Sequence, residues 1–414
     1  MPLSTKPYKG ARDFYPEDKR LMKYMFSVIR QVVESYGYEE YDAPILEPIE
    51  LYLSKTSEEI VSQQTYSFED RGGRKVTIRP EMTPTVSRMV AARRQELAYP
   101  LRWYSIPNVW RYERPQHGRL REHWQLNVDL FGVEDISAEI EMLQVANSIF
   151  RAYGASEDMY EIRVNSRKAL GEAITSVGVI TGVTDVIRSV DMFEKLSREE
   201  LTEKLRKQVK NPDKLLEYLT SAQPNDEIRK LIDACQQLGF RVVFVPSLAR
   251  GFDYYTDIVF EVFDKHPENN RSMFGGGRYD GLVAQFGVEP LPTVGFGMGD
   301  VTLKYFLQIH SLLPALKPET SVAVVLAGDV FLQAQQVIDK IRQSGINLSV
   351  DLSGRKLDKQ LRSADKKGVK YVLVIGEKEL SEGVYSLKEL KSGASESLST
   401  AEIIEKLTKE KTIS

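Results

Sequence analysis

The chain has 414 residues, and 56 Lys and Arg against 59 Asp and Glu give it a formal net charge of −3. This length suggests two to three domains, and the charge balance excludes a generally basic nucleic-acid coat, so any nucleic-acid surface must be a local patch. The single cysteine excludes a disulfide framework and a cysteine-based zinc site. Because there is no apolar run long enough to span a bilayer and no apolar N-terminal stretch of secretory type, we expect no membrane partner and a reducing compartment, most simply the cytoplasm.

The first part of the chain, residues 1–165, predicts α+β structure. Apolar side chains recur at helical spacing over residues 21–36, and Gly37 is placed to end that helix. Short strands broken by turn residues follow, one of them with Val76 and Ile78 in alternation. Strand-like sequence resumes at residues 240–316, as if the same domain were being completed.

The stretch between these two parts, residues 166–239, is dense in charge and predicts a helical insertion. Leu and Ile recur in it at helical spacing, and Ser197 followed by Glu200 predicts a capping box.

Residues 319–414 show a third pattern, in which strands alternate with helices and predict a small α/β domain with a largely parallel sheet. The expected strands are 322–326, 348–350 and 371–375, and the expected helices are 331–342 and 356–367.

The most informative segment is a basic loop followed by an alternating strand. Residues 111–121 contain four arginines around a Pro and a Gly. From Trp124 to Leu130 apolar and polar residues alternate, with Gln125, Asn127 and Asp129 on the polar face. One interpretation is a solvated surface strand beside a basic loop. The other is a pocket wall, in which polar side chains lie in register beside guanidinium groups that bind phosphate.

Three further segments combine glycine or tyrosine with charge. Arg250 and Gly251 predict a turn that opens a strand, on which Tyr254 and Tyr255 face opposite sides, so only one of them faces a given pocket directly. The glycines of 275–277 and 295–299 allow close approach to a ligand or a neighbouring strand. Neither run matches the dinucleotide-binding or P-loop pattern. The four histidines show no metal-ligand spacing, and no GxSxG nucleophile motif occurs.

Taken in order, these segments resemble the histidyl-tRNA synthetases, a branch of the class II aminoacyl-tRNA synthetases. The resemblance rests on residues 9–16, 36–38 with the Pro44 strand, 78–83, 111–132, 250–255 and 275–281. It implies an α+β catalytic domain with an antiparallel sheet over 1–165 plus 240–316, a helical insertion over 166–239, and an α/β anticodon-binding domain over 319–414.

The resemblance also implies roles for the histidine pocket. Glu81 and Thr83 are expected to hold the α-ammonium of histidine. Gln125 and Asp129 are expected to line the pocket. The tyrosines that complete it are Tyr254, Tyr255 and Tyr279.

ATP and tRNA sites follow from the same resemblance. Arg111 and Arg250 are the expected catalytic cations at the α-phosphate, and Glu113 and Arg121 are expected to contact ATP. The residues expected to meet the tRNA acceptor end are Gln116, Arg119 and Arg121.

The implied activity is ATP-dependent attachment of L-histidine to tRNA(His) through a histidyl-adenylate, with release of AMP and pyrophosphate, Mg²⁺ on the phosphates and a homodimeric enzyme. The residues fit this chemistry, because positioning and fixed positive charge drive phosphoryl transfer without a protein nucleophile. Hydrogen bonding to both imidazole nitrogens would reject apolar competitors, so we expect no editing domain.

Two positions depart from the family pattern. Asp129 stands where many members have Glu. Thr302 stands where the third motif usually carries an Arg, and Arg121 and Arg114 are the candidates to hold the ATP tail instead.

Basic residues gather between Arg355 and Lys370, where seven bases face two acids. The run is either a solvated helix face or a tRNA-binding surface with Lys359, Arg362 and Lys366 at its centre.

Two other functions remain open at this point. One is a non-catalytic regulatory subunit of ATP phosphoribosyltransferase in histidine biosynthesis, which typically lacks the anticodon domain and the ATP-binding arginines. The other is a stand-alone tRNA-binding module, which leaves Glu81, Gln125 and Asp129 unexplained.

Overall fold

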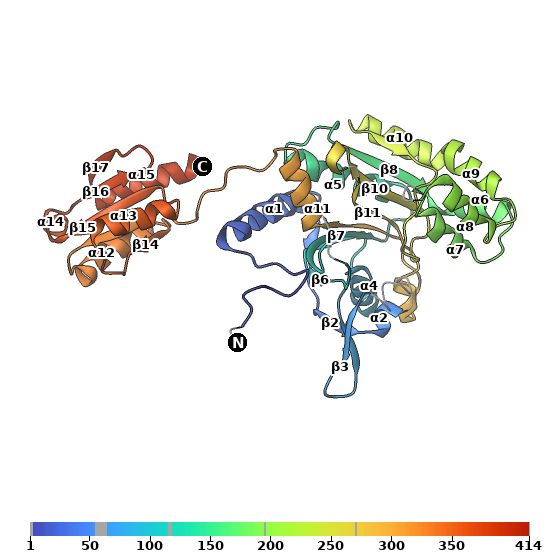
Figure 1. The fold of residues 1–414 in the computed structure, drawn as a ribbon, viewed down its shortest axis with the longest axis horizontal. Coiled ribbons are helices and arrows are strands. Elements are labelled where there is room, and N and C mark those ends of the chain that lie inside the picture. The colour runs from blue at the N-terminus through green and yellow to red at the C-terminus, as the bar shows by residue number, and fades with distance from the viewer. Residues whose placement is uncertain (1–2, 54–63, 115–117, 194–195, 270, 414) are drawn as a thin grey trace. The chain divides into compact units, whose positions relative to one another are not determined.

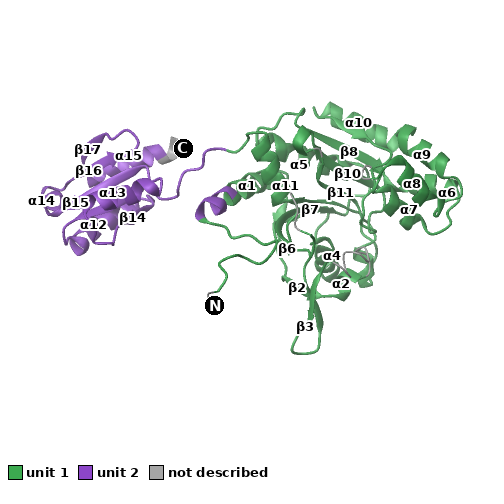
Figure 2. Cartoon of the chain, in the orientation of Figure 1, with its two compact units in different colours: residues 1–15, 22–313 green, residues 16–21, 314–414 purple. Residues whose placement is uncertain are grey.

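The computed structural model describes residues 3–53, 64–114, 118–193, 196–269 and 271–413 (Figure 1). The chain divides into two compact units, residues 1–15 with 22–313 and residues 16–21 with 314–414 (Figure 2). Among the residues that the structure describes, no helix combines the length and apolarity needed to cross a membrane.

A nine-stranded sheet forms the centre of the first unit. Its five inner pairings are antiparallel, and the two edge pairings, β1 with β5 and β8 with β9, are parallel. The sheet runs in the order β1 (Glu39–Glu40), β5 (Leu101–Ser105), β7 (Glu122–Phe131), β12 (Thr293–Gly299), β11 (Ser272–Arg278), β10 (Ile258–Asp264), β8 (Tyr160–Ser166) and β9 (Val242–Phe244), with β6 (Asn108–Trp110) beside β7. The predicted antiparallel sheet is confirmed.

Helices pack against this sheet and supply its apolar core. Helix α11 (Asp300–Ile309) contacts β7, β11 and β12, and α5 (Ser137–Ala152) contacts β12 (Figure 1). Phe150 of α5 stacks on Phe274 and meets the edge of Phe306, so that both helices are fixed to β11. Helix α1 (Pro16–Ser35) ends where predicted, with Gly37 at a φ of 81°.

A smaller antiparallel sheet precedes residues 111–121, the basic segment called the arginine-rich loop below. It has the order β2 (Leu46–Pro48), β4 (Lys75–Ile78) and β3 (Tyr66–Glu69), and two helices follow its strands in the chain, α2 (Glu50–Leu53) and α4 (Thr83–Ala92). Helix α4 packs against the 3₁₀ turn η2 (Val283–Phe286), while a second turn, η1 (Pro267–Asn269), lies between β10 and β11.

Residues 167–237 form five helices within the described part of this stretch: α6 (Arg167–Ser176), α7 (Val183–Val190), α8 (Arg198–Arg206), α9 (Pro212–Ser221) and α10 (Asp226–Gln237). Helices α6 to α9 share an apolar core of their own, whereas α10 packs against α5, β8 and β9. The capping box of Ser197 and Glu200 is present as predicted. The compact units do not separate this stretch from the rest of the first unit, so its boundaries as an insertion stay a prediction.

The C-terminal residues form a five-stranded sheet in the order β14 (Leu348–Val350), β13 (Val322–Ala327), β15 (Tyr371–Gly376), β16 (Val384–Glu389) and β17 (Ser395–Ser399). The first three strands are parallel, and β16 and β17 add antiparallel pairings that the sequence did not predict, because β17 is short and polar. The helices are α12 (Phe331–Gln343), α13 (Leu357–Lys366), α14 (Glu377–Glu382) and α15 (Thr400–Ile413).

Candidate active site

A cavity of about 880 Å³ opens in the first unit and gathers side chains from segments that are far apart in the sequence. Of the residues predicted for the site, those that line it are Glu81, Thr83, Arg111, Glu113, Arg119, Gln125, Arg250, Tyr254, Tyr255 and Tyr279. His123 and Gln125 of β7 line the cavity, whereas Asn127 and Asp129 are buried beyond its lining, so the interpretation of β7 as a solvated surface strand is wrong. Asn127 and Asp129 are each only 3% exposed.

Asp129 is not itself a lining residue but lies buried directly behind Tyr279 and Gly295, which do line the cavity. The hydroxyl of Tyr279 donates a hydrogen bond to its Oδ1, and its Oδ2 is buried without a hydrogen-bond partner among the described residues. Burial raises the pKa of Asp129 to about 7, against the opposing effect of the Tyr279 hydrogen bond. A Cβ atom at Gly295, which lies opposite Asp129 on β12, would overlap Oδ1 and approach the Tyr279 hydroxyl to 2.9 Å. The glycine is therefore what allows this carboxylate to lie inside the sheet.

Glycine makes room for Gln125 in the same way. The Gln125 amide donates to Oδ1 of Asn127 at 2.7 Å, and Asn127 donates to the Gln125 carbonyl at 3.0 Å. A Cβ atom at Gly297 of β12 would overlap Nε2 of Gln125. The close approach predicted at residues 295–299 is thus between the backbone of β12 and the side chains of β7.

Glu81 and Thr83 lie where β4 leads into α4. Glu81 is buried, and its Oε2 accepts a hydrogen bond of 3.2 Å from Tyr254. Thr83 is the first residue of α4. A carboxylate and a hydroxyl at a helix start present oxygen acceptors, which suit an ammonium group.

Tyr254 and Tyr255 correct the sequence analysis. They precede β10, which begins only at Ile258, so the alternation of a strand does not apply to them. Both are buried, their ring centroids are 4.8 Å apart, and both line the cavity. The expectation that only one of the two faces the pocket is wrong.

Arg250 contributes a guanidinium that is nearly buried. It forms an ion pair with Glu261 of β10, and its Nε has no hydrogen-bond partner in the described part of the chain. Burial lowers the pKa of Arg250, but the neighbouring Glu261 charge and the tyrosines raise it further, so the net direction is upward. The facing residue Gly275 of β11 leaves space for this pair, since a Cβ atom there would lie 2.6 Å from Nη1 of Arg250.

Arg111 reaches the cavity from the segment after β6. Its Nε donates to the carbonyl of Pro80 at 2.9 Å, which fixes the side chain and leaves the rest of the guanidinium toward the cavity. Glu113 lies 3.8 Å from Arg119 in a loose ion pair. Gln116, predicted to contact tRNA, lies outside the described residues.

Arg121 and Arg114 do not line the cavity. The Arg121 guanidinium donates to the Glu113 carbonyl and to the Tyr8 hydroxyl, both at 3.1 Å, and lies 3.9 Å over the ring of Tyr112. The Arg121 carbonyl accepts a hydrogen bond of 2.8 Å from the Arg111 amide, but the Arg121 guanidinium lies among aromatic residues and not in the cavity lining.

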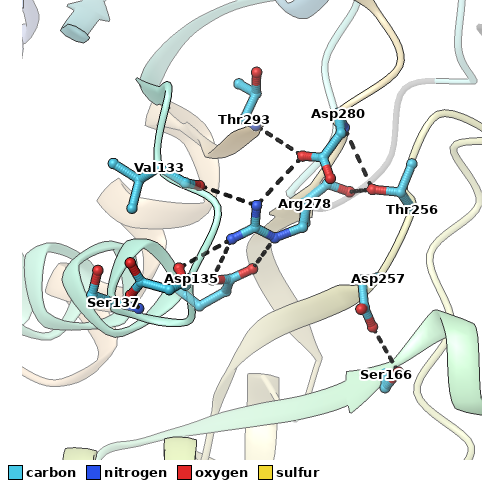
Figure 3. A network of polar contacts seen from close by, with 10 residues as sticks. Val133, Asp135, Ser137, Ser166, Thr256, Asp257, Arg278, Asp280 and Thr293 are labelled. Atoms are coloured by element: carbon cyan, nitrogen blue, oxygen red, sulfur yellow. Dashed lines mark hydrogen bonds and ion pairs between the residues drawn. The ribbon is translucent and has the colours of Figure 1, made fainter. Parts of the chain in front are cut away.

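A buried polar network holds the end of β11, directly before Tyr279. Arg278 donates to both carboxylate oxygens of Glu139, at 2.6 and 2.8 Å, and to the carbonyls of Val133 and Asp135 (Figure 3). Asp280, next in the chain to Tyr279, accepts a hydrogen bond of 2.9 Å from the amide of Thr293 (Figure 3). Tyr279 is therefore fixed from both sides, which positions its hydroxyl at Asp129.

Comparison with known proteins identifies this arrangement. The family profile described as histidyl-tRNA synthetase matches residues 10–300, and the profile of an anticodon binding domain matches residues 321–410. The chain belongs to the histidyl-tRNA synthetase family. Curated histidine–tRNA ligases are similar over almost the whole length: that of Leptospira biflexa is 42% identical, covering 99% of this chain and 98% of the relative. That of Haloarcula marismortui is 37% identical, covering 93% of each.

Solved structures show the same fold. Histidyl-tRNA synthetase from Nostoc sp. PCC 7120 has a TM-score of 0.80 at 24% identity, covering 99% of this chain and 100% of that one. A Bacillus halodurans structure titled as an ATP phosphoribosyltransferase regulatory subunit/histidyl-tRNA synthetase has a TM-score of 0.73 at 21% identity, covering 91% and 99%. The predicted family and fold class are confirmed.

Several residues of this synthetase's cavity were not singled out from the sequence. His123, Arg163, Asp191, Glu261 and Arg271 all line it. Burial, with the charges of Arg111 and Arg12, lowers the pKa of His123 to about 3, so its ring is neutral. The alternation of β7 could have predicted His123, because it lies on the same face of the strand as Gln125. No sequence pattern indicates Asp191, which directly follows α7.

The described part of the synthetase offers neither a reactive thiol nor a cluster of metal ligands. Cys235 is buried in α10, where burial raises the pKa of its thiol to about 12, so it offers no thiolate. Within the described ranges, no group of three or more His, Cys, Asp or Glu is arranged to hold a metal ion.

The basic residues of the C-terminal unit lie on α13. Lys359, Arg362 and Lys366 are exposed and follow a spacing of three and four residues, which places them along one side of the helix. Two flanking bases are paired, Arg355 with Asp351 at 3.3 Å and Lys370 with Glu410 at 2.5 Å.

Proposed function

We propose that this chain attaches L-histidine to tRNA(His) at the expense of ATP, through a histidyl-adenylate, releasing AMP and pyrophosphate. One arrangement carries the proposal: Tyr279, which lines the same cavity as Arg111 and Arg250, holds the buried carboxylate of Asp129, whose other oxygen has no hydrogen-bond partner among the residues that the structure describes. The carboxylate suits an imidazole N–H, and the cations suit phosphate oxygens.

In this proposal histidine is bound at both of its ends. Glu81 and Thr83 accept hydrogen bonds from the α-ammonium, with Tyr254 holding Glu81 in place. Asp129 accepts from the imidazole, and Gln125, Tyr255 and Tyr279 complete the pocket. An apolar amino acid would leave these buried groups unpaired, which a site of this kind rejects strongly.

In the first step a carboxylate oxygen of histidine attacks the α-phosphorus of ATP. A new O–P bond forms, and the bond to the bridging oxygen breaks with its electrons leaving on pyrophosphate. Arg111 and Arg250 stabilise the charge that builds on the phosphoryl oxygens. In the second step a terminal ribose hydroxyl oxygen of tRNA attacks the histidyl carbonyl carbon. The bond from that carbon to the phosphate oxygen breaks with its electrons leaving on AMP, and the hydroxyl proton is released to solvent. No side chain acts as a nucleophile in either step.

Mg²⁺ belongs to this proposal as a companion of ATP. The described residues provide no metal site of their own, and Glu113 is the carboxylate beside Arg111 at the cavity. The ion would therefore be held mainly by the β- and γ-phosphate oxygens, where it would offset their charge.

The tRNA is proposed to contact both units. Gln116, Arg119 and Arg121 belong to or flank the loop proposed to meet the acceptor end, and Arg119 is exposed. Lys359, Arg362 and Lys366 of α13 would contact the anticodon side. The proposed domains are a catalytic domain over 1–165 plus 240–316, a helical insertion over 166–239 and an anticodon-binding domain over 319–414. The proposed location is the cytoplasm, where translation uses the product.

A homodimer is the proposed assembly. Exposed large apolar side chains gather on and beside the small sheet, namely Ile45, Leu46, Leu53 and Phe68 at 43–57% exposure. Such side chains are typical of a surface that another chain covers. Sedimentation of the wild type and of Leu46→Asp tests this, and a wild-type monomer at micromolar concentration would contradict it.

The regulatory-subunit alternative is not favoured. Arg111 and Arg250 both line the cavity, and residues 321–410 match the anticodon binding domain. The test of the proposed function is ATP–pyrophosphate exchange with each of the twenty amino acids, followed by charging of tRNA(His). Exchange is expected with histidine alone, and exchange with no amino acid would overturn the proposal.

A further inference from the structure

Arg271 is a cavity residue for which the family resemblance supplied no role. It directly precedes β11, and its carbonyl accepts a hydrogen bond of 3.2 Å from the amide of Asp264, which fixes the backbone at the start of the strand. Its side chain is exposed and lines the cavity. The Arg271 side chain therefore lies at the mouth of the cavity, whereas the Arg250 side chain is nearly buried.

The guanidinium of Arg271 and the side chain of Thr302 both approach one residue of the arginine-rich loop, Gly118. A Cβ atom on Gly118 would lie 3.4 Å from Nη1 of Arg271 and 4.0 Å from Cγ2 of Thr302. Three segments thus converge there: the loop, the start of β11 and the first turn of α11. Thr302 itself carries no charge, and its hydroxyl is 3.1 Å from the carbonyls of Met273 and of Gly299.

Several charged and polar groups surround this end of the cavity, which Arg119 and Arg163 also line. The His123 ring, which lies 3.9 Å from where a Cβ on Gly299 would be, is buried and neutral. Arg12 is bound to Asp300, the first residue of α11, at 2.8 Å. The charge of Arg250 is offset by Glu261. A polyphosphate tail that carries several negative charges needs a further guanidinium beyond the α-phosphate, and an exposed one at the mouth can reach it.

We propose that Arg271 binds the β- and γ-phosphates of ATP and stabilises the departing pyrophosphate, so that β11 supplies the cation that position 302 of α11 does not. This inference rests on the proposed function and adds to it a phosphate-binding residue. It also replaces Arg121 and Arg114, which lie outside the cavity lining, as the group that holds the ATP tail.

The pyrophosphate reaction separates this role from others. In histidine-dependent exchange, Arg271→Ala is expected to raise the KM for pyrophosphate and for ATP about tenfold or more, since a hydrogen bond to a charged group contributes about 1.5–3 kcal/mol. The KM for histidine is expected to stay within about twofold. Arg271→Lys, which keeps the charge but not the planar fork, is expected to fall between Arg271→Ala and the wild type.

Arg241→Ala is the matched control, because Arg241 is an exposed arginine of the same unit that does not line the cavity. It is expected to match the wild type. If Arg271→Ala leaves the KM for pyrophosphate unchanged, or raises only the KM for tRNA, the proposal is overturned while the proposed function stands. A wild type without histidine-dependent exchange would overturn both. Arg271→Lys keeps the test decisive if Arg271→Ala unfolds.

Discussion

The Tyr279 hydroxyl donates to one oxygen of Asp129, while the other oxygen of that carboxylate, within the part of the chain that the structure describes, has no hydrogen-bond partner. A buried carboxylate oxygen left without a donor is unfavourable in the free protein, and a ligand N–H that reaches it gains affinity. The pair therefore links the fold of the sheet to the choice of amino acid.

Asp129→Ala is expected to weaken histidine binding about tenfold to a hundredfold, because it removes a charged acceptor for the imidazole. The KM for ATP is expected to change little, because the proposed contacts of the phosphates are with Arg111 and Arg250. Titration with each substrate measures both. Equal losses for histidine and ATP would show that the substitution had disturbed the whole cavity.

The pH dependence of stability follows from the same residue. The pKa of Asp129 is raised by burial to about 7, above its value of about 3.9 in the unfolded chain, so the folded state binds the proton more tightly. This contribution to stability is full below about pH 4 and is lost as the pH rises through about 7. Asp129→Asn removes it and keeps the acceptor for Tyr279. The unfolding free energy of Asp129→Asn relative to wild type is therefore expected to rise between about pH 4 and pH 7. A difference independent of pH would contradict the raised pKa.

Arg250→Ala is expected to reduce histidine-dependent exchange by at least two orders of magnitude, by analogy with the loss of a single transition-state donor. Because it leaves Glu261 buried without its cation, it is also expected to lower the melting temperature. The double variant Arg250→Ala, Glu261→Gln separates the effects: stability is expected to return and exchange is not. Exchange that recovers with stability would remove Arg250 from the mechanism.

Gly297→Ala tests the space made for Gln125. The new methyl group would overlap the Gln125 amide, which is a side chain and can move, so the fold is expected to survive while the KM for histidine rises several-fold. Gly171→Ala in α6 is the control, since a Cβ there meets only Val183, at 3.8 Å. It is expected to stabilise the protein slightly, as alanine is a better helix former than glycine. An unchanged KM for Gly297→Ala would show that Gln125 does not contact the amino acid.

What the sequence could and could not predict follows from the range of each interaction. The predicted strands and helices of residues 319–414 depend on local apolar periodicity, and the structure has them within one or two residues. The pairings of Gly275 with Glu261 and of Gly295 with Asp129 depend on the register between strands that are distant in the sequence. Local patterns carry no information about that register, so although the close approach at these glycines was predicted, the side chains that they accommodate, Glu261 among them, were not. Tyr254 and Tyr255 were both predicted as pocket residues, but the expectation that only one of them faces the pocket was wrong because the start of β10 was placed too early.

Neutralising α13 tests whether its basic side binds tRNA. Replacing Lys359, Arg362 and Lys366 with Gln is expected to raise the KM for tRNA and to leave ATP–pyrophosphate exchange unchanged, because the adenylate forms in the other unit. The slope of log affinity against log salt is expected to become shallower by about 0.7–0.9 for each tRNA phosphate that the variant no longer neutralises. Replacing Lys340, Lys378 and Lys391, which are exposed bases of the same unit away from α13, removes the same net charge and is the control. If both triple variants weaken tRNA binding equally, the effect is one of net charge, and the side of α13 that carries Lys359, Arg362 and Lys366 is only solvated surface.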